Sequence, residues 1–127
     1  MTERSGLSAA QTEAEIKKRL QRIAEFYGQV PFVSQTLADH PDLFLPFSDL
    51  SRRLLVEPQH LSLKEMELAS VAAGSALGSE HCLGVHIPQA LKVGASRDEV
   101  MEAIMIGSFM AMAKGQSVGL RKLAEQK

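Results

Sequence analysis

The side chains best suited to chemistry in this 127-residue chain lie around its single cysteine, Cys82. Ser79, three residues earlier, is a residue type favoured at helix N-caps, so it predicts that Cys82 lies in the first turn of a helix. In a first turn, the free amides and the positive end of the helix dipole favour a thiolate over a thiol. Because the thiolate is the nucleophilic form, this position predicts a reactive cysteine.

Two further side chains are spaced to assist the thiol. His86 follows Cys82 by four residues, so the imidazole lies one turn along the same helix face and can meet the sulfur directly or through a water. Glu67 belongs to the preceding predicted helix, and its carboxylate would orient the imidazole if the two helices pack antiparallel across a turn at Gly78. His81 is roughly 100° around the helix from Cys82, so we expect it to border the site or to face a partner subunit.

Each of these residues also has a purely structural interpretation. A lone buried cysteine is most often an inert small hydrophobic residue, and a lone histidine is more often structural or simply exposed. A single glutamate on a helix is typically solvated. The pairing of Cys82 with His86 at one turn is the observation that favours chemistry, and the candidate catalytic set is Cys82, His86, Glu67, His81 and Ser79.

Helices must position this set, and the sequence predicts helices throughout, with no convincing strand. Apolar residues recur at helical spacing, and Ser62 and Ser96 each begin a capping-box pattern with a glutamate three residues later. Pro46 is expected in a first turn or at a break between two short helices. The helix that follows Ser96 carries several methionines and is expected to be deeply buried and to pass through the core. The predicted helices span residues 13–28, 32–39, 42–55, 62–77, 79–93 and 96–115, with a short final stretch over 118–125.

Length and composition limit the organisation and the function classes. With 45% hydrophobic residues, the chain is expected to form one domain over residues 1–127, with 1–11 flexible and 62–94 as the motif-bearing hairpin. Its 14 basic and 15 acidic residues are interspersed, which argues against nucleic acid as a partner. No apolar run approaches the roughly 20 residues of a membrane-spanning helix, and one cysteine cannot form an internal disulfide. We therefore expect no membrane partner and a cytoplasmic location.

At these residues the sequence resembles the carboxymuconolactone decarboxylase superfamily, and within it the alkylhydroperoxidase D-like branch. The signature of that branch is a glutamate, eleven residues, and then Cys-x-x-Cys-x-x-x-His. Glu67, Ser79, Cys82 and His86 have this spacing, with serine in place of the first cysteine, and His81 falls where some members also have a functional histidine. The similarity extends over most of residues 31–115.

The resemblance implies an all-α, antiparallel bundle of about six to seven helices that assembles as a homo-oligomer, commonly a trimer or hexamer. It also implies that Cys82, aided by His86 and Glu67, attacks a hydroperoxide, and that an external thiol reduces the resulting sulfenic acid. Ser79 would contribute a cap and a hydrogen bond, although it cannot join the intramolecular disulfide that two-thiol members form. The implied activity is that of a thiol-dependent peroxidase, and we expect no cofactor and no metal.

Two other classes stay open. The founding decarboxylases of the superfamily act on a lactone acid without a thiol pair, so the chain would then bind or process a small carboxylic acid. No compact basic set lies near the motif to support that reading, since Lys92 and Arg97 come at the far end of the fifth helix and beyond it. The third class is a non-catalytic protein or a metal binder using His81, Cys82, His86 and Glu67. Adjacent residues of a helix cannot point the same way, which disfavours the metal set.

Overall fold

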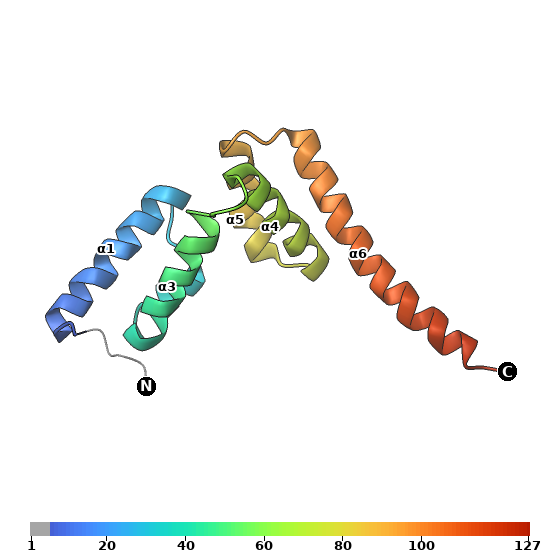
Figure 1. Ribbon diagram of the computed structural model, residues 1–127, viewed down its shortest axis with the longest axis horizontal. Coiled ribbons are helices and arrows are strands. Elements are labelled where there is room, and N and C mark those ends of the chain that lie inside the picture. The colour runs from blue at the N-terminus through green and yellow to red at the C-terminus, as the bar shows by residue number, and fades with distance from the viewer. Residues whose placement is uncertain (1–5) are drawn as a thin grey trace. The chain divides into compact units, whose positions relative to one another are not determined.

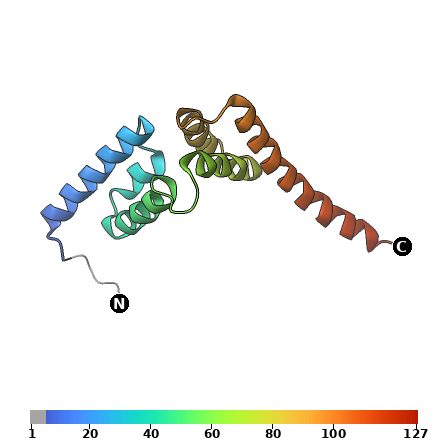
Figure 2. The same cartoon turned by 45° about the horizontal axis from the view of Figure 1, so that its top comes forward.

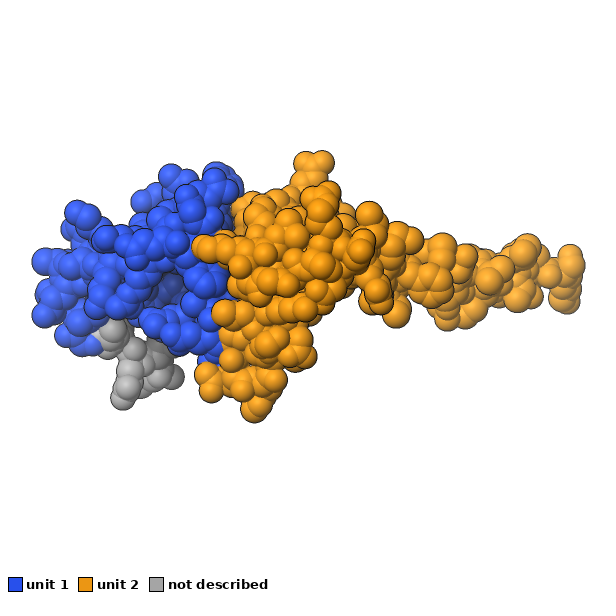
Figure 3. Space-filling model, turned by 90° about the horizontal axis from the view of Figure 1, so that it is seen from above, with its two compact units in different colours: residues 1–57 blue, residues 58–127 orange. Residues whose placement is uncertain are grey.

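The computed structural model describes residues 6–127, and within them it contains six α-helices and no strand (Figure 1). This confirms the predicted all-α fold class. The chain divides into two compact units, residues 1–57 and 58–127, which Figure 3 shows in different colours. The organisation as a single domain stays a prediction.

The first unit contains helices α1 (Ala9–Tyr27), α2 (Phe32–Leu37) and α3 (Pro41–Leu55). Ser8 caps α1 by accepting a hydrogen bond from the backbone of Gln11, so the helix begins inside the segment expected to be flexible; residues 1–5 of that segment lie outside the described residues. Arg19 of α1 ties the unit together, since its guanidinium donates to the backbone carbonyl of Leu45 at 3.0 Å and to the hydroxyl of Ser48 at 2.6 Å, both in α3.

Helix α3 is continuous, and this corrects the position expected for Pro46. The helix begins with Pro41 in its first turn, where the missing amide hydrogen has no intrahelical partner in any case. Pro46 lies in the second turn, inside the helix. It removes one backbone hydrogen bond, but Phe44 and Ser48 on either side are buried, so their packing holds the chain helical across the proline.

The second unit contains α4 (Leu63–Leu77), α5 (Glu80–Lys92) and α6 (Arg97–Ala124). Ser62 and Ser96 form the predicted capping boxes, each with both reciprocal hydrogen bonds. Gly78 ends α4 with a φ of 65°, a left-handed conformation that favours glycine, and the chain then reverses into α5. The predicted helical hairpin is therefore present, and the two ribbon views show α4 and α5 side by side (Figures 1 and 2).

The core of the second unit lies between α4 and its two neighbours. Val71 and Ala90 are fully buried there, with Ala95, Val100 and Ala103 nearly so. Helix α6 meets α4 at Gly107, where a side chain would overlap the backbone carbonyl of Ala72. The two backbones thus approach closely because residue 107 has no Cβ.

Two expectations about α6 are wrong. The helix does not break at Gly115 but continues to Ala124, because a glycine in a helix interior costs only about 1 kcal/mol and ends a helix only if it adopts another conformation. The helix is also not deeply buried: only Val100, Ala103 and Gly107 of this helix are classed as buried, while Met101 and Met105 are each 59% exposed. A search for membrane spans over the described residues finds no helix long and apolar enough to cross a bilayer.

Candidate functional site

The α4–α5 hairpin brings Glu67 and His86 together in its interior. The Glu67 carboxylate is fully buried and its Oε2 lies 2.7 Å from Nδ1 of His86, which is 9% exposed. The two residues are nineteen positions apart in the sequence. The antiparallel packing of α4 on α5 is what places the carboxylate against the imidazole, as the sequence predicted from the turn at Gly78.

The hydrogen bond to Glu67 selects the form of the imidazole. An ionised carboxylate can only accept hydrogen bonds, so Nδ1 of His86 donates to Glu67 and the neutral ring presents its lone pair at Nε2. This is the arrangement in which a carboxylate orients a histidine for proton transfer at its other nitrogen. The second oxygen of Glu67, Oε1, is buried and has no hydrogen-bond partner among residues 6–127. A buried carboxylate with half of its acceptor capacity unused is costly, and such groups concentrate at functional sites.

Cys82 lies in the first turn of α5. The hydroxyl of Ser79, the N-cap, accepts a hydrogen bond from the backbone amide of Cys82 at 3.2 Å. The thiol is free, and the residue is half-buried. The N-cap role expected for Ser79 is thus present in the structure.

The thiol and the imidazole share a helix face without a direct hydrogen bond. Cys82 and His86 are separated by one turn of α5, but none of the hydrogen bonds in the described part of the chain joins the sulfur to the ring. Proton transfer between them therefore requires a bridging water or the substrate itself. His81 is exposed, and its place at the edge of the site stays a prediction.

Gly74 is a site residue that sequence reasoning missed. A Cβ at this position would lie 3.4 Å from Cβ of Cys82 and 3.2 Å from Cδ2 of Leu83. Gly74 follows Glu67 by two helical turns on the same face of α4, so one face of this helix holds the imidazole and also leaves room for the thiol. A glycine inside an otherwise good helix was the available signal, since it is retained at a cost in helix propensity.

The structure was also searched for the residues that metal binding and the binding of an acidic substrate would need. Within residues 6–127, no group of three or more His, Cys, Asp or Glu side chains is placed to hold a metal ion. No lysine or arginine is buried in the described part of the chain, and Lys92 and Arg97 are both exposed. The interior of the hairpin therefore offers a carboxylate and an imidazole but no cation to bind an acidic substrate.

Comparison with known proteins places the chain in a family. The model of the carboxymuconolactone decarboxylase family matches residues 41–123, which include α3, the whole α4–α5 hairpin and nearly all of α6. The chain therefore belongs to the carboxymuconolactone decarboxylase family. Comparisons with curated proteins and with solved structures give no match.

Proposed function

We propose that this protein is an alkylhydroperoxidase D-like, single-cysteine thiol peroxidase that reduces organic hydroperoxides with an external thiol. The observation that carries the proposal is the buried hydrogen bond between Glu67 and His86, one helical turn from a half-buried free thiol at a helix start. Membership of the carboxymuconolactone decarboxylase family supports it, as does the absence of a buried lysine or arginine among residues 6–127 to bind a lactone acid.

The first step oxidises the cysteine. The thiol proton of Cys82 moves through a bridging water to Nε2 of His86, whose orientation Glu67 holds. The sulfur attacks the terminal oxygen of the hydroperoxide, so an S–O bond forms as the O–O bond breaks. The alkoxide leaves and takes the proton from His86, giving an alcohol and a sulfenic acid at Cys82.

External thiol completes the cycle, since Ser79 cannot act as a resolving cysteine. One thiol molecule attacks the sulfenic sulfur and releases water, leaving a mixed disulfide on Cys82. A second thiol molecule attacks the mixed disulfide, forms the small disulfide and releases the Cys82 thiolate. Two thiols are thus oxidised for each hydroperoxide reduced.

Turnover with a chemical reductant tests this proposal. We expect wild-type protein to consume cumene hydroperoxide in the presence of dithiothreitol, and Cys82→Ser to show only the background rate. His86→Ala should lower the rate about 100-fold, a typical loss for a general acid–base group. His60→Ala, which removes an exposed histidine from the segment before α4, is the matched control and should retain the wild-type rate.

Equal rates for wild type and Cys82→Ser would refute the peroxidase proposal. A loss in Cys82→Ser with no effect of His86→Ala would refute the role of the Glu67–His86 pair. If no hydroperoxide is consumed, turnover of a lactone acid by the same protein would favour the decarboxylase alternative.

A further inference from the structure

Four of the six helices in the described part of the chain begin at a serine whose hydroxyl accepts a hydrogen bond from the backbone amide of the third helical residue. These serines are Ser8, Ser62, Ser79 and Ser96. In α1, α4 and α6 the third residue is a glutamine or a glutamate, and its side chain accepts a hydrogen bond from the backbone amide of the capping serine in return. In α5 the third residue is Cys82. The sulfur therefore occupies the position at which the other three helices place a hydrogen-bonding side chain.

The backbone of Ser79 does not complete such a pair with Cys82. Its amide donates instead to the carbonyl of Gly74 at 2.9 Å, in the turn that ends α4. No hydrogen bond joins the sulfur of Cys82 to another of the described residues. The side chain of Ser79 is thus the part of this N-cap that is left for the thiol.

The hydroxyl of Ser79 has one hydrogen-bonding function unused. A serine hydroxyl carries one hydrogen and two acceptor lone pairs. One lone pair accepts the backbone amide of Cys82 at 3.2 Å, and no acceptor among residues 6–127 takes the hydrogen. Because that amide belongs to the same residue as the sulfur, the hydroxyl is held beside the Cys82 side chain.

The oxygen of Ser79 and the sulfur of Cys82 are within reach of each other. Residues three apart on a helix have Cβ atoms about 5 to 6 Å apart, and Oγ and Sγ each lie one bond beyond Cβ. Rotation about one side-chain bond in each residue brings the two atoms to hydrogen-bonding distance. Side chains at these two positions already meet the backbone of each other's residue in the capping box of α4, where the reciprocal bonds of Ser62 and Glu65 are 3.0 and 3.1 Å long.

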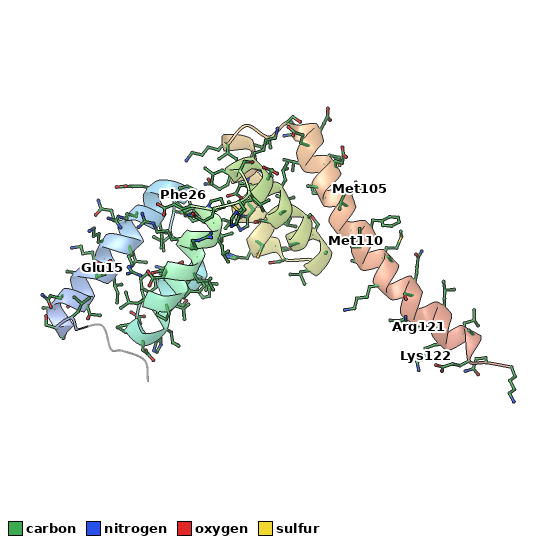
Figure 4. All side chains as sticks on the ribbon, viewed as in Figure 1. Glu15, Phe26, Met105, Met110, Arg121 and Lys122 are labelled. Atoms are coloured by element: carbon green, nitrogen blue, oxygen red, sulfur yellow. The ribbon has the colours of Figure 1, made fainter. Side chains whose placement is uncertain are left out.

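A thiolate at Cys82 has no paired cation in the described residues. Residues 65–91, which include most of the hairpin, contain no lysine or arginine. The C-terminal half of α6 carries Lys114, Arg121 and Lys122, and none of them forms a hydrogen bond or an ion pair with Cys82. Figure 4 shows Arg121 and Lys122 near the far end of α6, well beyond α4 and α5. Neutral donors at the start of α5 must therefore stabilise the thiolate, and the N-cap hydroxyl is a side-chain donor held at that point.

Ionisation of the thiol strengthens a hydrogen bond from this hydroxyl. A thiol sulfur is a weak acceptor, whereas hydrogen bonds to charged groups are roughly twice as strong as neutral ones. A donor that binds the thiolate more strongly than the thiol favours the ionised form. The thiolate attacks in the first step of a thiol peroxidase cycle and is released again from the mixed disulfide, so the same bond acts at both stages.

We propose that Ser79 is a positioning residue that acts through Cys82: its hydroxyl accepts the Cys82 amide, donates its hydrogen to the Cys82 sulfur and thereby stabilises the thiolate. The inference rests on the proposed peroxidase function for its place in a reaction, where it assists both the formation and the release of the thiolate. The hydrogen bond itself involves only these two residues, so it is tested without any hydroperoxide.

Thiol–disulfide exchange of full-length protein with dithiodipyridine, followed from about pH 5 to pH 10, measures the population of the thiolate and its reactivity together. Removing the donor should move the midpoint of the rate profile up by about one pH unit. Below both midpoints the thiolate population then falls about tenfold, while each thiolate becomes about threefold more reactive. Ser79→Gly, which removes the hydroxyl at little cost to the helix start, should react about threefold more slowly there and about threefold faster above both midpoints. The two profiles should cross.

Three further variants separate hydrogen-bond donation from helix capping. Ser79→Thr keeps a hydroxyl and should restore the wild-type profile. Ser79→Ala loses both the donor and the cap, and its profile should shift as far as that of Ser79→Gly. Ser96→Ala loses the equivalent cap of α6 and is the matched control, so its profile should match wild type. Circular dichroism checks that each variant is folded, and if Ser79→Gly is not, the comparison of Ser79→Thr with Ser79→Ala decides.

A shifted profile for Ser79→Ala with an unshifted one for Ser79→Gly would show that Ser79 acts only as a cap and would overturn the proposal. A shift in Ser79→Thr as large as that in Ser79→Ala, or an equal shift in Ser96→Ala, would do the same. Failure of the wild-type protein to consume hydroperoxide refutes the peroxidase function but leaves these exchange profiles to be compared. Unchanged profiles with normal peroxide turnover refute the role of Ser79 alone.

Discussion

At the scale of single residues, the buried pair of Glu67 and His86 is better suited to chemistry than to stability. Removing a carboxylate and an imidazole from water costs several kcal/mol, and one hydrogen bond at 2.7 Å returns only part of that cost. Oε1 of Glu67 makes no hydrogen bond with the described residues, so it does not offset this cost. The α4–α5 hairpin would gain more stability from two apolar side chains.

This imbalance predicts how variants of the pair affect stability. His86→Leu leaves the carboxylate buried without its partner, so we expect it to lower the free energy of unfolding by about 3 kcal/mol. Glu67→Leu combined with His86→Leu should be as stable as wild type or more stable, since two apolar residues then pack in the same space. Urea denaturation midpoints measure both. A double variant as strongly destabilised as His86→Leu alone would contradict this explanation, because removing the unpaired carboxylate would then have restored nothing.

The sequence was sufficient to predict which residues form the site, but not all of the contacts that surround them. The four-residue step from Cys82 to His86 and the N-cap at Ser79 are local, so helix periodicity suffices to place them. The contact of Glu67 with His86 required only that the two helices form a hairpin. Neither the unsatisfied Oε1 nor the closeness of Gly74 to Cys82 follows from spacing, because both depend on how near the two helices approach.

At the scale of elements, glycine at residue 107 sets the distance between α4 and α6. Gly107→Ala would drive a methyl group into the backbone carbonyl of Ala72, which cannot move aside as a flexible side chain can. We expect the free energy of unfolding to fall by about 1 to 3 kcal/mol. Gly84→Ala in α5 is the control: its Cβ meets nothing, so improved helix propensity should raise stability by up to about 1 kcal/mol. Similar melting temperatures for the two variants would contradict the close approach.

The starts of α4 and α6 are joined by a charge pair that makes stability depend on pH. The ammonium of Lys64 lies 2.6 Å from the carboxylate of Glu99 and, together with the backbone amide of Ser96, holds the pKa of Glu99 below its ordinary 4.5. A lowered pKa means that this stabilisation is fully present above pH 4.5 and is lost as the pH falls through the value in the folded protein.

Glu99→Gln should therefore flatten the decline of the melting temperature between about pH 5 and pH 2. Glu13→Gln, which changes an exposed glutamate of α1, is the matched control and should leave the decline as in wild type. If Glu99→Gln shows the same slope as the control, the pair with Lys64 does not contribute to stability in solution.

The starts of helices could be predicted from the sequence where a capping motif is present. The end and the burial of α6 could not, because they depend on tertiary packing. Ser62 and Ser96 each predict a helix start, because the glutamate three residues later completes a capping box with two reciprocal hydrogen bonds. Gly115 looked like a stop because glycine is common at helix ends, but the backbone there stays helical. The burial of α6 was overestimated because an apolar, methionine-rich sequence does not reveal whether its cover comes from the same chain or from another.

At the scale of the whole molecule, the homo-oligomeric assembly expected from the family resemblance predicts that stability depends on protein concentration. If folded chains associate, mass action stabilises the native state as concentration rises. We expect the melting temperature of wild-type protein to increase by several degrees between about 1 and 100 μM. A wild-type melting temperature that does not change with concentration would contradict the association.

The central claim is that Cys82 reduces hydroperoxides through a sulfenic acid, and intact-mass spectrometry after one equivalent of cumene hydroperoxide tests it most directly. We predict that wild-type protein gains one oxygen atom, located on Cys82 and removable by thiol, and that Cys82→Ser gains none. Ser79→Cys should instead lose two hydrogens, because the added thiol can close a disulfide. An unchanged mass for wild type, or oxygen found only on methionine, would contradict the account.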